Sequence, residues 1–244
     1  MLPIDLQIIK YYLFEKPMFQ QKIKPYFNWK SYQSLEESLE KVEKDPAIET
    51  TDFSKTTFTI FDLETTGLIP EIGHEIISIG AIQLTGNKFC RTEKFHQIIK
   101  PVRPVSRRIK NLTGIDKHEL VNASPFIDAF SNFLQYSSGT ILVAHPAKFD
   151  IRFLQSMIKR WKLPAYRPYV LDSQLMAKWL LPQVNHQLDP LIRHLGIERL
   201  ERHHALNDAI MTAELFEYLL KEARKQGIST YQELRPILEQ FQNK

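Results

Sequence analysis

The sequence predicts an α/β protein in which a mixed β-sheet is flanked by helices. Two features of the chain predict this fold class. Segments rich in β-branched and aromatic residues follow one another at residues 56–62, 74–84 and 88–99, as expected for strands. Beyond residue 124, helical and strand-like patterns alternate, which is typical of helices layered on a sheet.

The chain is expected to contain three segments: an extension over residues 1–52, a main domain over residues 53–225, and a C-terminal helix within residues 226–244. The extension is predicted to be mainly helical. Its clearest helix is expected at residues 34–44, where apolar residues recur at helical spacing. Ser34 followed by Glu37 has the form of a capping box at the start of this helix.

Aromatic residues and lysines interleave within residues 10–30 of the extension. Such a mixture occurs on nucleic-acid surfaces, where rings stack on bases. It also occurs where aromatic rings pack on a neighbouring domain while the lysine head groups face water. We favour the packing interpretation. A nucleic-acid surface, or a docking element for a replication or repair partner, remains an alternative.

The main domain begins with the first three strands, and Gly86-Asn87 predicts a hairpin between the second and the third. Residues 139–145 form a short apolar run, which is typical of a strand buried on both faces. The polar and basic residues 106–120 are expected to surround a turn. A last short strand is expected at residues 169–172. Helices are predicted at residues 125–136, with Pro125 first, and at residues 147–160, 173–180, 188–195, 204–225 and 230–242.

The composition is that of an ordinary globular protein, with 244 residues, 43% of them apolar and 25% charged. The net charge of +4 is compatible with a polyanionic partner. A single cysteine excludes an internal disulfide framework and a multi-cysteine zinc site. The N-terminus does not resemble a signal peptide, and no apolar stretch reaches the ~18 residues of a membrane span. We therefore expect a cytoplasmic protein without a membrane partner.

Asp62 and Glu64 stand at the end of the first predicted strand, just before the turn at Gly67. Residues two apart on a strand point to the same face, so these two carboxylates project together. Paired acids beside a hydrophobic strand are unfavourable unless a cation lies between them. A divalent metal ion is the natural candidate, because hard cations bind carboxylate oxygens.

Three further polar residues lie beside predicted core elements. Asp150 falls one turn into the helix after the buried strand, and Asp208 falls in the first turns of the long helix near residue 204. His203 precedes Asp208 by five residues. Each acid alone is more simply explained by a structural role, such as the interaction of Asp208 with the helix dipole. Four acids and a histidine in these positions together favour a catalytic site.

These positions resemble the three motifs of the DnaQ-like 3′–5′ exonucleases. The first motif is similar to Phe61-Asp-Leu-Glu-Thr-Thr-Gly-Leu68, and the second to Ala144-His-Pro-Ala-Lys-Phe-Asp150. His203 to Asp208, followed by Ala209, is similar to the third motif of the branch called DEDDh. That branch includes the epsilon proofreading subunit of bacterial DNA polymerase III. The resemblance extends over residues 56–221 and leaves the extension unassigned.

The resemblance implies a ribonuclease H-like fold and a metal-dependent 3′–5′ exonuclease. Such an enzyme releases nucleoside 5′-monophosphates from DNA 3′ ends, with single-stranded ends favoured, in proofreading or repair. It uses two Mg²⁺ or Mn²⁺ ions. Asp62, Glu64 and Asp208 would hold one ion, and Asp62 would bridge to a second ion whose site Asp150 completes.

The resemblance also assigns a general base. His203 would take a proton from the attacking water, a role suited to a side chain that titrates near neutrality. On chemistry alone His204 is a rival. The five-residue spacing to Asp208 favours His203, and we expect a packing or surface role for His204.

Substrate contacts are expected next to the first two motifs. By resemblance, the backbone at Thr65 and Thr66 cradles the terminal nucleotide, Leu68 wedges beside its base, and His145 reaches the nucleotide. The threonines could equally be turn residues, and His145 could equally be a buried, hydrogen-bonded histidine. Pro146 departs from the asparagine that many members carry, so a polar contact near the second motif is lost.

Two other functions remain open on the sequence alone. The first is an RNA-directed 3′–5′ exoribonuclease, because the same five residues would serve either polymer and the 2′-hydroxyl is recognised elsewhere. The second is a catalytically idle module that binds nucleic acid or a polymerase. The complete set of acids disfavours the idle module, since mutually repelling carboxylates have no structural use. A polymerase or repair protein is the expected protein partner.

Overall fold

The computed structural model describes residues 3–86 and 88–242, without the side chains of residues 88–93. Its centre is a mixed sheet with strand order β3-β2-β1-β4-β5. The strands are β1 (Thr57–Thr65), β2 (Ile76–Thr85), β3 (Lys88–Ile98), β4 (Ile141–Ala144) and β5 (Val170–Asp172). β2 runs antiparallel to β1 and β3, whereas β4 and β5 run parallel to β1. The predicted α/β class and mixed sheet are confirmed.

Helices precede, interrupt and follow the strands. The extension contains α1 (Ile4–Lys10), the π-helix η1 (Tyr11–Glu15), α2 (Lys16–Ile23), the 3-10 helix η2 (Lys24–Asn28), α3 (Lys30–Lys41) and α4 (Ala47–Thr50). The later helices are η3 (Pro70–Ile72), α5 (Arg107–Thr113), α6 (Lys117–Asn122), α7 (Phe126–Tyr136), α8 (Ala147–Arg160), α9 (Ser173–Leu180), α10 (Leu188–Leu195), α11 (Ala205–Lys225) and α12 (Tyr231–Glu239). The mainly helical character of the extension is confirmed. None of the described helices has the length and hydrophobicity that a bilayer crossing requires.

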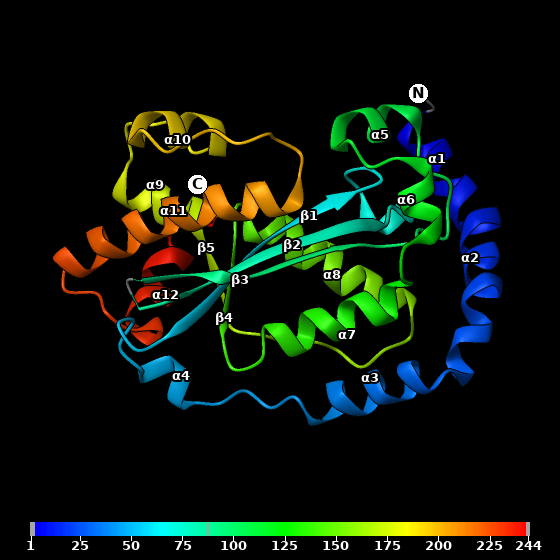
Figure 1. Cartoon of the computed structure of the whole chain (residues 1–244), viewed down its shortest axis with the longest axis horizontal. Coiled ribbons are helices and arrows are strands. Elements are labelled where there is room, and N and C mark those ends of the chain that lie inside the picture. Colours follow the sequence, from blue (N-terminus) through cyan, green and yellow to red (C-terminus); the bar gives the residue numbers. More distant parts are fainter. Residues whose placement is uncertain (1–2, 87, 243–244) are drawn as a thin grey trace.

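The side chains of β1 alternate between two hydrophobic cores. Phe61 and Leu63 belong to the core formed with α3, α7 and α8. Phe58 and Ile60 belong to the core formed with α9, α10, α11 and α12. Figure 1 shows α11 above the strands and α7 below them. Because side chains alternate along a strand, the even-numbered residues at the end of β1 face the side that α11 covers.

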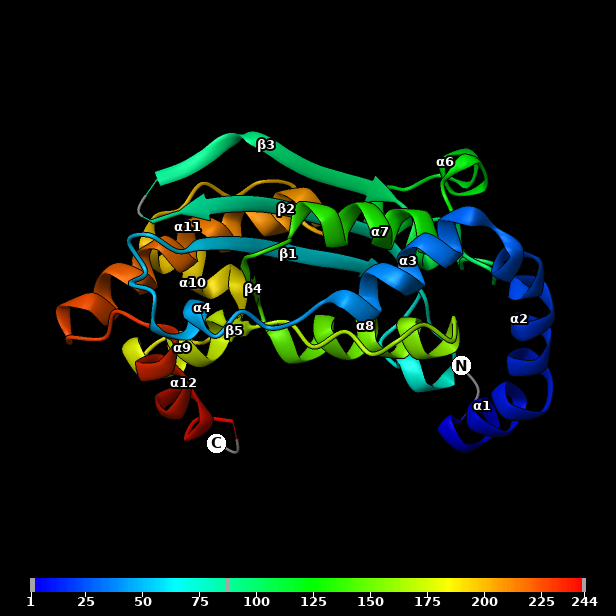
Figure 2. The ribbon, with the colours of Figure 1, turned by 90° about the horizontal axis from the view of Figure 1, so that it is seen from below.

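The N-terminal extension wraps one end of the sheet, and α3 then runs along the face that carries α7 (Figure 1 and Figure 2). Its rings pack on Trp161, next to the end of α8. The centroid of the Trp161 ring system lies 6.2 Å from that of Phe19 and 5.3 Å from that of Tyr26. The Tyr32 hydroxyl donates a 3.0 Å hydrogen bond to the Trp161 carbonyl oxygen. These contacts agree with the packing interpretation for part of the aromatic residues, whereas Tyr12, Phe14 and Trp29 are exposed.

The predicted start of the helix at residues 34–44 is wrong. α3 begins at Lys30, after the N-cap residue Trp29, and ends at Lys41. Ser34 therefore lies inside the helix, where its carbonyl oxygen accepts a hydrogen bond from the Ser38 hydroxyl. The capping-box pattern misled the prediction because burial of Tyr32 extends the helix by one turn toward the N-terminus.

The polar segment 106–120 contains helices rather than a turn alone. The Ser106 hydroxyl caps α5, and Asp116 with Glu119 forms a capping box at α6. These helices are held by their caps and bury few side chains, so they lack the apolar periodicity that predicts a helix. Pro125 is the N-cap of α7 rather than its first residue. In the predicted hairpin Gly86 has a positive φ of 61°, and Asn87 lies outside the described residues.

Candidate active site

Asp62 and Glu64 lie at the end of β1, on the face of the sheet that α11 covers. Asp62 pairs with Gly80 of β2, and Glu64 pairs with Ser78. Gly80 allows α11 to approach closely, because a Cβ atom there would lie 2.1 Å from the backbone nitrogen of Leu206. The glycine therefore brings the start of α11 next to the two predicted acids.

The first turn of α11 places Asp208 near Glu64. His204 caps this helix, with its Nδ1 accepting a hydrogen bond from the N–H of Asn207 at 3.4 Å. The backbone N–H of His203 donates to Asp208 Oδ2 at 3.2 Å. His203 has a φ of 61°, which is uncommon for a residue with a side chain. This backbone turn holds the segment before α11 against Asp208.

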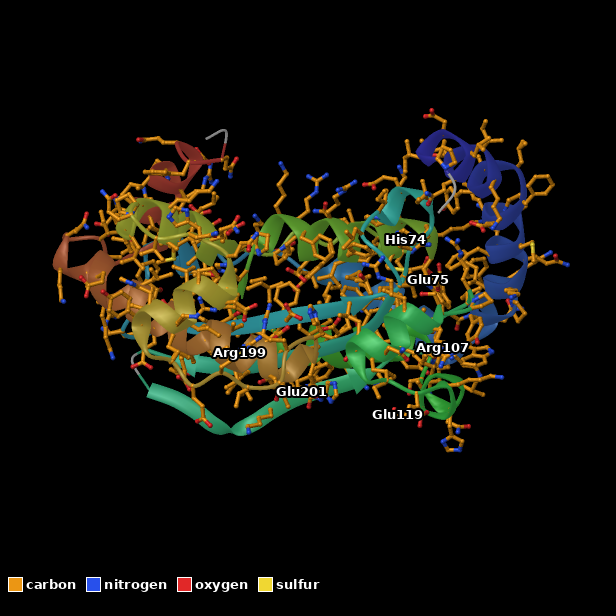
Figure 3. The ribbon with its side chains drawn as sticks, turned by 90° about the horizontal axis from the view of Figure 1, so that it is seen from above. His74, Glu75, Arg107, Glu119, Arg199 and Glu201 are labelled. Atoms are coloured by element: carbon orange, nitrogen blue, oxygen red, sulfur yellow. The ribbon has the colours of Figure 1, made fainter. Side chains whose placement is uncertain are left out.

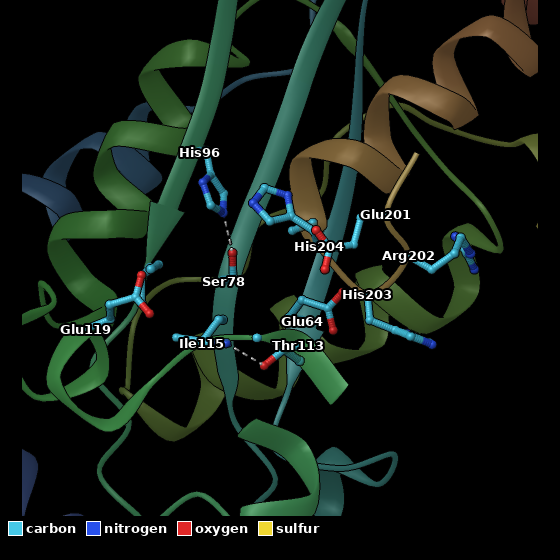
Figure 4. Close-up of a pocket in the computed structure, with 13 residues that line it drawn as sticks. Glu64, Ser78, His96, Thr113, Ile115, Glu119, Glu201, Arg202, His203 and His204 are labelled. Carbon is cyan, nitrogen blue, oxygen red and sulfur yellow. Dashed lines mark hydrogen bonds between the residues drawn. The ribbon is translucent and has the colours of Figure 1, made fainter. Parts of the chain in front are cut away.

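Glu64, His203 and Asp208 converge on one point. Each offers a ligand atom, and the three atoms lie within 4.8 Å of one another. Glu64 and Asp208 are 8% and 4% exposed, whereas the His203 side chain is open to solvent. Figure 4 shows Glu64 and His203 lining the same cavity. Two carboxylates and an imidazole in this arrangement can hold a divalent cation.

Asp150 approaches the same acids from the first turn of α8. It is 2% exposed, and its carboxylate accepts a hydrogen bond from the backbone N–H of Leu63. Burial raises the pKa of Asp150 well above its usual range, and the charges of Asp172 and Glu64 raise it further. Burial also raises the pKa of Asp62, with the charge of Asp150 next in importance. Asp62 and Asp150 are therefore close enough to repel each other strongly.

One arginine, Arg202, opposes the rise in the pKa values of Glu64 and Asp208. Burial raises the pKa of Glu64 to about 8, the charge of Asp208 raises it further, and Arg202 opposes the shift. Burial also raises the pKa of Asp208, and Arg202 lowers it. Acids with raised pKa values lose their protons more readily when a cation lies between them. The donor set thus fits a bound metal ion.

Two residues of this site escaped the sequence reasoning. Arg202 Nη1 donates to Asp208 Oδ1 at 2.6 Å, and its Nε lies 3.1 Å from Asp189 Oδ1. Asp172 caps α9 at the end of β5, and its charge contributes to the raised pKa of Asp150. The cationic side chain directly before His203 was a usable signal for Arg202. Its partner could not be inferred, because the pairing depends on how the loop before α11 folds.

The predicted substrate residues of the first motif lie in the turn after β1. The Thr65 hydroxyl donates to the Gly67 carbonyl oxygen at 2.7 Å. The Thr66 hydroxyl accepts from the N–H of Glu75 at 2.9 Å, and the Thr66 N–H donates to the Glu75 carbonyl oxygen at 2.8 Å. Both hydroxyls therefore serve the turn, as in the structural alternative. Leu68 is 73% exposed, so its apolar side chain is free to contact a ligand.

His145 matches the hydrogen-bonded alternative. Its Nδ1 is 2.9 Å from the Ser173 hydroxyl, and its Nε2 is 2.9 Å from the carbonyl oxygen of His186. Burial lowers the pKa of His145 to about 4, so the ring is neutral at physiological pH. Both ring nitrogens are engaged within the chain. Pro146, next to it, is the N-cap residue of α8.

A cavity of about 250 Å³ opens beside Glu64 and His203. Its wall includes His96 of β3, whose Nε2 is 3.0 Å from the Ser78 hydroxyl. The His96 and His204 rings lie 4.6 Å apart between centroids. Burial lowers the pKa of His96, and His204 lowers it further. Figure 4 shows His96, Ser78 and His204 together at the wall of this cavity.

Relatives of this chain are found among bacterial polymerases. A DNA polymerase III PolC-type protein of Thermotoga maritima is 36% identical over 216 residues, which is 88% of this chain and 15% of that protein. A DNA polymerase III subunit epsilon-like protein of Rhodobacter capsulatus is 33% identical over 193 residues, which is 77% of this chain and 27% of that protein. The chain therefore spans only a small part of the length of these relatives.

Solved structures share the fold at lower identity. The nuclease domain of 3′hExo, a DEDDh family member bound to rAMP, superposes with a TM-score of 0.62 at 21% identity, covering 70% of this chain and 95% of that one. Exonuclease X in complex with 5′ overhanging duplex DNA gives 0.58 at 21%, covering 74% and 99%. The family model described as "Exonuclease" matches residues 59–216, which include all five predicted catalytic residues. The resemblance carried by the three motifs is thereby confirmed, and the chain belongs to the exonuclease family.

Proposed function

We propose that this chain is a metal-dependent 3′–5′ exonuclease that releases nucleoside 5′-monophosphates from DNA 3′ ends. The convergence of Glu64, His203 and Asp208 within 4.8 Å is the observation that carries the proposal. Asp62 and Asp150 add two more carboxylates with raised pKa values to the same region. This donor set suits Mg²⁺ or Mn²⁺, both of which bind carboxylate oxygens.

Asp62, Glu64 and Asp208 would hold one ion, and Asp62 would bridge to a second ion near Asp150. Two such ions, when bound, stabilise the attacking and the leaving oxygen of an in-line displacement. The protein contributes the fixed positions of these acids. Hydrogen bonds from Leu63 to Asp150 and from His203 to Asp208 hold two of the carboxylates in place.

His203 would act as the general base that takes a proton from the attacking water. Its side chain is open to solvent and lies beside Glu64 and Asp208, so water can reach it. His204 is less suited to the role, because its Nδ1 is engaged in capping α11. These contacts support the assignment that the five-residue spacing favours.

The terminal nucleotide would bind between the turn after β1 and the cavity beside Glu64. Leu68 presents an exposed apolar side chain for a base. The hydroxyls of Thr65 and Thr66 are engaged in the turn, so these residues would act through the shape of the backbone. His145 would act indirectly, by holding the segment before α8 through its two hydrogen bonds.

DNA is the favoured substrate because the similar relatives are named as DNA polymerase III proteins. The same names support a replication or repair partner and a cytoplasmic location. RNA is the second candidate, because the 3′hExo neighbour of similar fold is bound to rAMP. The acids do not distinguish the two polymers, since discrimination requires a contact to the 2′-hydroxyl.

The proposal is tested with matched single-stranded DNA, mismatched duplex and RNA oligonucleotides, labelled at the 5′ end, with Mg²⁺, with Mn²⁺ and with EDTA. We expect stepwise shortening of single-stranded DNA from its 3′ end that requires a metal. Asp62→Ala should abolish it while circular dichroism stays unchanged. Full activity in Asp62→Ala, or oligonucleotide binding without cleavage by the wild type in Mn²⁺, would contradict the proposal. Faster RNA cleavage would favour the second candidate.

A further inference from the structure

We propose that the N-terminal extension is a clamp that holds the turn at residues 66–75 and so positions the bound 3′ nucleotide, with Tyr11 and Glu15 as positioning residues. The proposal rests on the function above, because that turn carries Leu68 and the backbone expected to cradle the nucleotide. A continuous series of contacts leads from η1 to this turn. Figure 3 labels His74 and Glu75, which lie in the middle of that series.

The first contact joins Tyr11 to Gly73. Tyr11 is 4% exposed, and its ring lies so close to Gly73 that an added Cβ would be 2.4 Å from the ring. Gly73 ends η3 with a φ of 86°, a conformation that favours glycine. The turn therefore has both the backbone angle and the missing side chain that this ring contact requires.

The second contact is ionic. Glu15 Oε2 lies 2.7 Å from Arg103 Nη2, and both side chains are mostly buried. Arg103 Nη1 in turn donates to the carbonyl oxygen of Ile72 at 2.9 Å. One arginine thus joins the extension to the turn. An ion pair with little solvent exposure is more sensitive to loss of one partner than a surface pair.

The third contact passes through Arg160, at the end of α8. The guanidinium lies 5.0 Å from the centroid of the Phe19 ring. Burial raises the pKa of the Tyr11 hydroxyl, and the charge of the Arg160 guanidinium lowers it. Its Nη2 donates to the carbonyl oxygen of His74 at 2.5 Å. The extension therefore covers the Arg160 guanidinium, which holds the turn. This burial excludes water from the hydrogen bond between Arg160 and His74.

The carboxylate of Glu75 anchors the other side of the turn. It accepts hydrogen bonds from the backbone N–H groups of Val102 and Arg103, each at 2.9 Å. Burial raises the pKa of Glu75, and Arg160 lowers it. Burial of the Glu75 carboxylate is favourable only while the Arg160 guanidinium stays beside it. Tyr11 and Phe19 keep this guanidinium in place.

The last contacts reach the proposed nucleotide site. His74 Nδ1 accepts a hydrogen bond from the N–H of Ile69 at 2.9 Å, and its ring packs against Gly67. Glu75 and Thr66 exchange the two hydrogen bonds described above. His74 and Glu75 therefore hold residues 66, 67 and 69, which surround Leu68. The extension in turn stabilises His74 and Glu75. Contacts to the substrate that are equally strong in the ground state and the transition state raise KM, without lowering kcat, when they are weakened.

The test compares Tyr11→Leu, Glu15→Gln and their double variant with two matched controls in the full chain. Tyr12→Leu removes an exposed neighbouring ring, and Glu40→Gln neutralises an exposed acid of α3. Amide hydrogen exchange is measured on the metal-free protein. We expect exchange in residues 66–75 to rise about tenfold in the double variant, with the strands and both controls unchanged.

The second readout is steady-state cleavage of single-stranded DNA in Mn²⁺. We expect the double variant to raise KM about 3- to 10-fold with kcat within about twofold, because binding is weakened while the acids stay in place. Unchanged exchange in residues 66–75, or faster exchange there with unchanged KM, would overturn the clamp. A uniform rise across the strands would show general destabilisation and would also overturn it. A wild-type chain without nuclease activity would refute the proposed function, and exchange would then decide the clamp alone.

Discussion

The acids of the site are held close together against their own repulsion. Burial and mutual charge raise the pKa of Asp62, Glu64 and Asp150. Burial also raises the pKa of Asp208, but Arg202, whose Nη1 lies 2.6 Å from Asp208 Oδ1, lowers it. At the scale of single residues, the metal-free site is therefore partly protonated and partly neutralised by an arginine. A bound metal ion would therefore replace both the protons and the guanidinium as the partner of these carboxylates.

The raised pKa of Glu64 predicts a pH-dependent stability. Its folded pKa of about 8 lies above the unfolded value, so the folded state binds the extra proton. The contribution of Glu64 to the free energy of unfolding of the metal-free protein should therefore be complete below about pH 4.5 and be lost as the pH rises to about 8. Denaturant unfolding in EDTA at several pH values measures this loss. Glu64→Gln, which cannot titrate, should lack it, and an equal pH dependence in that variant would contradict the assignment.

Arg202→Met should destabilise the metal-free protein, because Asp208 loses its only described cationic partner. We expect a loss of about 1.5–3 kcal/mol in the free energy of unfolding. Added Mn²⁺ should then raise the melting temperature by more than it does in the wild type, since the metal no longer competes with a guanidinium. Arg199→Met is the matched control, because Arg199 is exposed and contacts Asp189 instead. Equal effects of the two variants would refute a special role for Arg202.

At the scale of elements, the site depends on how closely α11 packs on β2. The helix delivers Asp208, and the strand β1 delivers Asp62 and Glu64 on the same face. The contact at Gly80 sets the distance between them, because any side chain there would collide with the backbone of Ala205 and Leu206. The position of α11 on the sheet therefore sets the distance between Asp208 and the two acids of β1.

Gly80→Ala should push α11 away from the sheet and weaken metal binding. Its Cβ would lie 2.2 Å from the Ala205 carbonyl carbon, and overpacking of this kind destabilises by about 1–3 kcal/mol or more. Melting temperature and Mn²⁺ affinity by calorimetry are the measurements. Gly139→Ala is the control, since it adds backbone strain at a φ of 71° but meets nothing within 4 Å. Unchanged Mn²⁺ affinity in Gly80→Ala would contradict this role of Gly80.

At the scale of the whole molecule, the extension shares the main hydrophobic core. Phe19, Ile23 and Leu35 are buried in the same cluster as the sheet residues Phe61 and Leu63. The extension proposed at residues 1–52 is thus distinct in sequence pattern and continuous with the core in space. Other apolar side chains of the extension, including Leu13 and Phe14, are exposed.

Phe19→Ala should destabilise the whole chain by about 3–4 kcal/mol, because a buried ring against Trp161 and Arg160 is lost. Phe14→Ala, on the same extension but 62% exposed, should change stability by less than about 0.5 kcal/mol. Denaturant unfolding followed by circular dichroism gives both values. Similar small effects in the two variants would mean that the extension is only loosely attached.

Much of the fold and of the site could be predicted because the signals are local. The helices at residues 147–160, 173–180 and 188–195 have the predicted bounds, since their apolar periodicity matches the faces they bury. The short helices α5 and α6 could not be predicted in this way, because caps rather than buried stripes hold them. Likewise, Ser34 has the sequence pattern of an N-cap but lies inside α3. The burial of Tyr32, before Ser34, sets the start of that helix.

The sequence by itself determined the exonuclease motifs, the paired acids and the histidine, because spacing along a strand or before a helix is a local property. The tertiary structure alone decided three things: the pairing of Arg202 with Asp208, the contact of α11 with Gly80, and the docking of Tyr11 and Glu15 on the turn. The last two join segments far apart in the chain, and the first follows from the turned backbone at His203. Such contacts arise only when the whole core is assembled, so no local pattern encodes them.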